Sequence, residues 1–188
     1  MSFIRTHVAY LVSMNKIDIE GVLIVEGKDD VSYLSSFVNA LFFSTNGYDL
    51  SEEKIEFLKL AATKNKLIIY TDPDEAGEKI RNILKSQINP VFEAKSAKIT
   101  RKTSGKCGVA ELAKTEVIKS LAPFVGKANK IHNYNLAAFI SLSENPQKQK
   151  EQLVKKYRLI NGNIKSLENQ LNILKIEPHE IEELLSGN

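Results

Sequence analysis

Cysteine and histidine are scarce in this chain of 188 residues, and their scarcity removes several classes of site. The single cysteine, Cys107, has no second thiol with which to form an internal disulfide or a cysteine zinc site. A lone cysteine also favours a reducing, cytoplasmic location. The histidines His7, His132 and His179 lie too far apart in sequence to predict a metal site.

Long apolar runs and phosphate-binding glycine motifs are missing as well. No apolar run approaches the roughly 20 residues of a membrane span, so we expect no membrane association. Residues 1–13 lack the small-residue cleavage site of a signal peptide, and we interpret residues 1–18 as an N-terminal extension. No glycine-rich loop of the nucleotide-binding kinds is present. The composition, 43% hydrophobic and 26% charged, is typical of a soluble globular protein.

Short apolar runs alternate with helical periodicity from residue 19 to about residue 123. The predicted elements are strands at 22–25, 41–44, 67–70 and 91–94, and helices at 29–39, from Ser51 onward, at 75–85 and at 109–120. Asn46-Gly47 predicts a turn, because both residues tolerate positive φ. This order predicts an α/β fold with a mostly parallel sheet covered by helices on both faces.

The character of the sequence changes after Pro123, where strand patterns stop. We expect a small helical module over residues 124–188, with helices near 133–143, 146–159, 163–174 and 178–185. Pro146 and Pro178 lie at predicted first-turn positions, where a missing N–H costs little.

Two acidic motifs directly follow predicted buried strands. Glu26 follows strand 22–25, and Asp72-Pro73-Asp74 follows strand 67–70. If these strands are parallel neighbours, the three carboxylates meet at the carboxyl edge of the sheet, where open α/β sheets place their sites. Carboxylates without histidine or cysteine suit Mg²⁺, which neutralises phosphate charge and activates water. Glu26 is the candidate for proton transfer, because neighbouring aspartates raise its pKa.

Simpler interpretations exist for the charged residues around these motifs. Asp29 and Asp30 fall in the first turn of a helix, where carboxylates cap free N–H groups, and Asp74 could do the same for the next helix. Lys28 could reach a phosphate or pair with these aspartates. Arg81, like Lys79, is interpreted mainly as a solvated charge on a helix face.

The basic residues are concentrated in two segments, although the net charge is only +3. One segment runs from Lys95 to Lys106 and contains no acid, and the other runs from Asn145 to Lys165 with Glu151 as its only acid. Basic segments beside an acidic metal site favour a polyanionic substrate.

The two acidic motifs, in this strand context, resemble the Toprim domain of type IA topoisomerases, bacterial primases and OLD nucleases. From about Asp18 onward the chain resembles the ribonuclease M5 family more closely. The resemblance rests on Glu26 to Asp30, Thr45 to Gly47 and Thr71 to Arg81. It continues through the loop from Gly105 to Val109 and is fainter from Asn161 to Ile176.

The resemblance implies a Rossmann-like Toprim catalytic domain at 19–123 and a helical RNA-recognition domain at 124–188. It implies a Mg²⁺-dependent endoribonuclease that cleaves double-stranded regions of precursor 5S rRNA, helped by a ribosomal protein that binds 5S rRNA. Glu26, Asp72 and Asp74 would be both the catalytic residues and the metal ligands. The residues then expected to contact RNA are Lys28, Lys98, Arg101, Lys102, Lys106, Lys155, Lys156 and Arg158.

One departure from the family pattern leaves other functions open. After Gly108-Val109 the family pattern has Glu then His, whereas this chain has Ala110 then Glu111. The alternatives are a non-catalytic RNA-binding or ribosome-assembly protein with a vestigial site, and another Toprim phosphotransfer enzyme acting on DNA.

Overall fold

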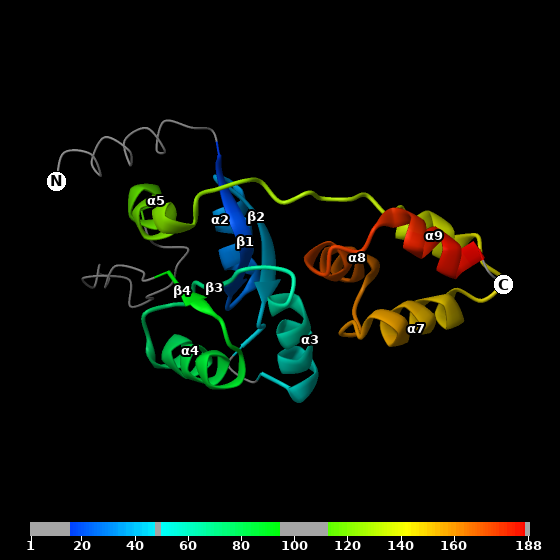
Figure 1. The fold of residues 1–188 in the computed structure, drawn as a ribbon, viewed down its shortest axis with the longest axis horizontal. Helices are drawn as coiled ribbons and strands as arrows, with labels where there is room; N and C mark the ends of the chain where they lie inside the picture. The colour runs from blue at the N-terminus through cyan, green and yellow to red at the C-terminus, as the bar shows by residue number, and fades with distance from the viewer. Residues whose placement is uncertain (1–15, 48–49, 95–112, 187–188) are drawn as a thin grey trace.

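A computed structural model describes residues 16–47, 50–94 and 113–186, and its centre is a four-stranded sheet (Figure 1). The strands are β1 (Ile17–Val25), β2 (Val38–Ser44), β3 (Leu67–Ile69) and β4 (Phe92–Glu93). Their order is β2-β1-β3-β4 and every neighbouring pair is parallel. The predicted parallel α/β fold is therefore confirmed.

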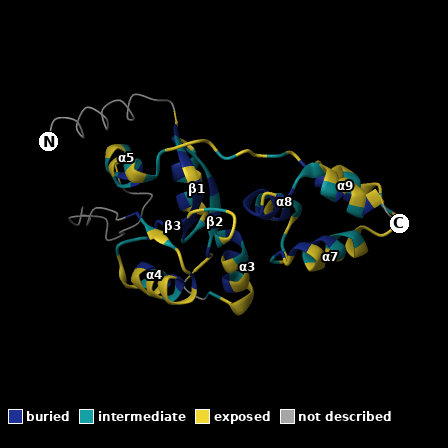
Figure 2. Ribbon diagram, in the orientation of Figure 1, coloured by how far each residue is buried: buried dark blue, intermediate teal, exposed yellow. Residues whose placement is uncertain are grey.

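Helices cover both faces of this sheet. They are α2 (Lys28–Ser35), α3 (Glu52–Ala62), α4 (Glu75–Gln87) and α5 (Lys114–Leu121), followed by the 3₁₀ turn η2 (Ala122–Phe124). Side chains alternate along β1, so that Leu23 and Val25 pack with α2 and α5, while Val22 and Ile24 pack with α3 and α4. Figure 2 shows the resulting buried strands and the exposed outer sides of the helices.

The C-terminal segment is helical as predicted, with α6 (Leu136–Ser141), α7 (Pro146–Tyr157), α8 (Ile164–Ile173) and α9 (Pro178–Ser186). α8 lies beside β2 and α3, and α7 and α9 lie beyond it (Figure 1). Leu167 and Leu171 of α8 join the apolar cluster of the sheet, and the Asn169 amide donates to the Phe42 carbonyl at 2.9 Å. One apolar core thus runs from the sheet into the helical segment.

Two predicted boundaries at the start of the fold are wrong. The helix predicted at 29–39 ends at Ser35, because Val38 begins β2 and pairs with Ile17. β1 begins at Ile17 and not at Val22, although Gly21 interrupts its apolar pattern. Gly21 has φ +136°, and a Cβ there would lie 2.4 Å from the Lys66 carbonyl oxygen, so glycine is required at this irregular point of the strand.

Candidate active site at the carboxyl edge of the sheet

Glu26 follows β1 directly, and Asp72 follows β3 after two further residues. Because β1 and β3 are hydrogen-bonded parallel neighbours, their ends lie side by side. The Glu26 Oε1 atom accepts a hydrogen bond of 2.8 Å from the backbone N–H of Asp72. The two acidic motifs therefore touch through this bond.

The Glu26 carboxyl is half-buried, and its surroundings change its acidity. Burial raises the pKa of Glu26, and the negative charges of Asp74 and Asp30 raise it further. The Asp72 N–H and the Arg81 guanidinium act in the opposite direction. The site is a cluster of negative charge in which Glu26 holds its proton more tightly than an ordinary glutamate.

Asp74 is the N-cap of α4. A helix cap is one of the two roles that the sequence leaves open for Asp74, the other being a metal ligand. Its Oδ1 accepts the Gly77 N–H at 2.9 Å, which satisfies a free donor of the first helical turn. Gly77 itself faces the acidic turn. A Cβ at Gly77 would lie 2.1 Å from the Asp72 carbonyl oxygen and 2.7 Å from Glu26 Oε1. The absence of a side chain at Gly77 is what allows α4 to approach both motifs.

Arg81 is not the solvated charge that the sequence suggested. Its Nη1 donates to the Asp72 carbonyl at 2.6 Å and to Thr71 Oγ1 at 2.8 Å, and its Nε lies 3.7 Å from Glu93 Oε1. Arg81 lies seven residues after Asp74, which is two helical turns along the same face of α4. This spacing is the feature of the sequence that indicates a contact between Arg81 and the acidic turn. The guanidinium fixes the turn that carries both aspartates. Lys79, in contrast, is exposed as predicted.

The backbone around Glu26 is held from two sides. Gly27 donates its N–H to Asp30 Oδ2 at 2.9 Å, so Asp30 is a cap, and burial raises the pKa of this carboxyl. Glycine is not required at position 27, because its φ of −133° and ψ of 175° are open to any residue. On the other side, Asn46 in a left-handed turn (φ 52°) donates its N–H to the Glu26 carbonyl at 2.8 Å.

The carboxylate oxygens of Glu26, Asp72 and Asp74 are the type of ligand that a hard divalent cation prefers, and their negative charge would balance the charge of the cation. Within the described ranges, however, no group of three or more histidine, cysteine, aspartate or glutamate side chains is gathered closely enough to hold a metal ion. Glu26 Oε1 and Asp74 Oδ1 instead accept backbone N–H groups. The second oxygen of each carboxyl takes no part in these bonds.

The candidate RNA-binding residues fall into three groups. Lys28 is exposed on the first residue of α2, next to Glu26. A second group, Lys155, Lys156 and Arg158, lies at the far end of α7 and is exposed. The remaining candidates, and the departure from the family pattern, lie outside the described residues: Lys98, Arg101, Lys102, Lys106, Ala110 and Glu111.

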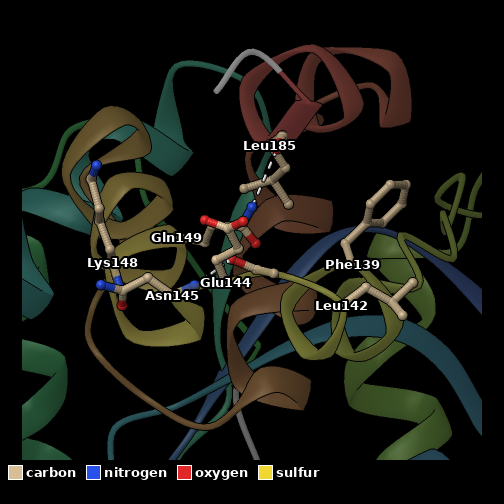
Figure 3. Close-up of a pocket in the computed structure, with 8 residues that line it drawn as sticks. Phe139, Leu142, Glu144, Asn145, Lys148, Gln149 and Leu185 are labelled. Atoms are coloured by element: carbon tan, nitrogen blue, oxygen red, sulfur yellow. Dashed lines mark hydrogen bonds between the residues drawn. The ribbon is translucent and has the colours of Figure 1, made fainter.

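A hollow of about 480 Å³ lies elsewhere, between the α6–α7 loop and the end of α9 (Figure 3). Phe139, Leu142 and Leu185 form its apolar wall, and the Gln149 amide donates to the Leu185 carbonyl at 3.2 Å. Among the described residues that line it, Glu144 is the only acidic one. Among its described lining residues, this hollow lacks the paired carboxylates of the carboxyl edge.

The fold is a parallel sheet with acidic residues at its carboxyl edge. Residues 21–102 match the Toprim domain family. The relatives are more specific, and all three described here are named ribonuclease M5. The protein of Fusobacterium nucleatum is 38% identical over 104 residues, which are 55% of this chain and 57% of that protein. The match is 31% identical for Mesoplasma florum, over 87% of this chain and 97% of that protein. It is 29% identical for Mycoplasma pneumoniae, over 90% and 97% respectively. The chain belongs to the ribonuclease M5 family.

Proposed function

We propose that this protein is a Mg²⁺-dependent endoribonuclease that matures precursor 5S rRNA by cutting its double-stranded regions. Membership of the ribonuclease M5 family identifies an endoribonuclease, in agreement with the enzyme class predicted from the sequence. The observation that carries the proposal is the hydrogen bond between Glu26 and the Asp72 backbone, which joins the two Toprim motifs at one edge. None of the described helices is long and apolar enough to cross a membrane.

Glu26, Asp72 and Asp74 would hold the cation, which when bound neutralises phosphate charge and activates a water. The protein itself orients and tunes these groups. The Asp72 N–H orients the Glu26 carboxylate, and Glu26 would be the group that exchanges a proton during cleavage. Arg81 holds the carbonyl of Asp72 and so prevents the turn from moving when the charge at the edge changes.

The RNA would lie across the exposed cations next to and beyond this edge. Lys28, which is exposed two residues after Glu26, would meet a phosphate near the site of cleavage, and the exposed end of α7 would offer further positive charge. We assign RNA recognition to the helical segment 124–188 and catalysis to residues 19–123. A ribosomal protein that pre-folds the 5S precursor would act as the partner of the reaction.

The test is cleavage of precursor 5S rRNA by wild type, with and without Mg²⁺, in the presence of the 5S-binding ribosomal protein. Glu26→Gln and Asp72→Asn each remove one charge from the edge and should abolish cutting. Glu56→Gln is the matched control, because Glu56 is an exposed residue of α3 paired with Lys59. Mg²⁺-dependent cleavage that only the edge variants lose supports the proposal. Tight RNA binding without cleavage by any of the proteins would refute it and favour the non-catalytic alternative.

A further inference from the structure

A second hollow, of about 180 Å³, lies where α3 meets the end of α7 and the residues that follow α8. Leu60, Tyr157 and Ile176 give it an apolar floor, and Lys64, Lys156 and Arg158 bring three positive charges to it. None of the described residues that line it is acidic. We call it the Arg158 hollow. It joins residues of the Toprim part to residues of the helical part.

One of these three cations is bonded to a helix end, and the other two are not. The Lys64 ammonium donates to the Leu174 carbonyl at 2.7 Å, and so caps the end of α8. Lys156 and Arg158 cap no helix end with their side chains in the part of the chain that the structure describes. Both are exposed, and no described carboxylate forms an ion pair with either of them. The Lys156 ammonium lies 5.4 Å from the centre of the Tyr157 ring.

The backbone of Arg158 is unusual for an arginine. It ends α7 in the left-handed conformation, with φ 52° and ψ 45°, while the next N–H, that of Leu159, donates to the Val154 carbonyl at 2.9 Å. Glycine or asparagine is the usual residue at such a helix end, because a Cβ is strained there. A strained position that carries an exposed, unpaired cation points to a role for the side chain.

The size and lining of the hollow indicate its ligand. Its volume lies below the roughly 300–1,000 Å³ of sites that enclose a free small molecule. Unpaired cations above an apolar floor suit a short piece of a polyanion whose phosphate meets the charges and whose sugar or base covers the floor. The ligand class that fits is the phosphodiester backbone of an RNA strand.

The hollow is also remote from the carboxylates. α3 begins near the carboxyl edge of the sheet and ends before Lys64, and its 11 residues span about 16 Å at about 1.5 Å per residue. A strand held there is distant from the bond being cut. We infer that the Arg158 hollow is a phosphodiester-binding site that anchors the RNA several nucleotides from the cleavage site. This inference rests on the proposed ribonuclease function.

The test compares two double variants that each remove two exposed cations. Lys156→Gln with Arg158→Asn changes the hollow, and asparagine tolerates the left-handed backbone, so the fold should be kept. Lys79→Gln with Lys127→Gln is the control, because both lysines are exposed, Lys79 on α4 and Lys127 in the segment between η2 and α6. Thermal unfolding checks that all the proteins are folded. The affinity for a labelled RNA duplex is measured with divalent cations chelated, at several salt concentrations, and cleavage of precursor 5S rRNA is measured with Mg²⁺.

We expect the hollow variant to bind RNA about tenfold more weakly, with a salt slope smaller by about 1.4–1.8 for two lost phosphate contacts. Its KM should rise while its single-turnover rate at saturation stays unchanged, because the contact is equal in ground and transition states. RNA affinity equal to that of the control variant would overturn the inference and leave the hollow to a protein partner. A loss of affinity accompanied by a lowered melting temperature, with an unchanged salt slope, would overturn it as well. If wild type neither binds nor cuts RNA, the proposed function itself has failed.

Discussion

Replacing Gly77 by alanine should damage both the stability of the fold and the rate of cleavage, although alanine favours helices. The added Cβ would lie 2.1 Å from the Asp72 carbonyl oxygen and 2.7 Å from Glu26 Oε1. An ordinary contact needs about 3.5 Å, so α4 and the acidic turn must separate by about 1 Å or more. That separation also stretches the 2.9 Å bond from the Gly77 N–H to Asp74 Oδ1.

Three free energies decide the result. Alanine in place of glycine inside a helix stabilises by about 1 kcal/mol. Overpacking costs about 1–3 kcal/mol, and loss of the Asp74 cap costs about 1 kcal/mol. The free energy of unfolding of Gly77→Ala should therefore be about 1–3 kcal/mol lower than that of wild type. A displacement of 1 Å at reacting groups also lowers the rate by about 100-fold.

Urea unfolding and single-turnover cleavage measure these two effects. Gly27→Ala is the matched control at the same site, because its Cβ would lie 3.6 Å from Asp30 Oδ2, an ordinary contact, and its backbone is extended. It should keep near wild-type stability. If Gly77→Ala proves as stable and as active as Gly27→Ala, the packing argument for the acidic turn is wrong.

Three further changes test other parts of the structure. Glu26→Gln should raise the melting temperature of the metal-free protein at pH 7. Because the pKa of Glu26 is raised in the folded state, wild type loses stability as the pH rises above the ordinary value of 4.5. Melting curves across pH should therefore show a difference in melting temperature between variant and wild type that vanishes below that value. Arg81→Ala should lower the free energy of unfolding by about 1–3 kcal/mol and slow cleavage, because the Asp72 carbonyl loses a charged donor, and a wild-type rate in single turnover would contradict this role. Asn172→Ala should lower the free energy of unfolding by about 1–3 kcal/mol in urea, because the buried Asn172 amide bonds to both the N–H and the carbonyl of His132. A change near zero would show that these two hydrogen bonds do not stabilise the fold.

The sequence predicts the sheet well because its central strands are buried on both faces. The runs 22–25 and 67–70 are continuously apolar, and such runs bounded by turn residues specify parallel strands. The start of β1 could not be predicted in this way. Asp18, Glu20 and Gly21 break the apolar pattern, and pairing with β2 overrides local preference.

The acidic edge could be predicted as a set of residue types, but not in its detailed contacts. The positions of Glu26 and Asp72 just after their strands can be predicted from the sequence. The hydrogen bond between the Glu26 carboxylate and the Asp72 N–H depends on the tertiary structure and cannot. The same holds for Arg81, whose charge resembles that of any exposed helix residue until the turn folds back to it. The glycine that matters is Gly77 and not Gly27, because crowding is a property of the packed structure.

The apolar core that continues from the sheet into α8 has a consequence for biosynthesis. Val22, Ile24, Leu41 and Phe43 share their cluster with Leu167 and Leu171, which are synthesised more than 100 residues after the first strand. A nascent chain that has not yet released α8 leaves part of this face of the sheet uncovered. We expect such a chain to complete the apolar core of its sheet only once α8 is free to pack against it.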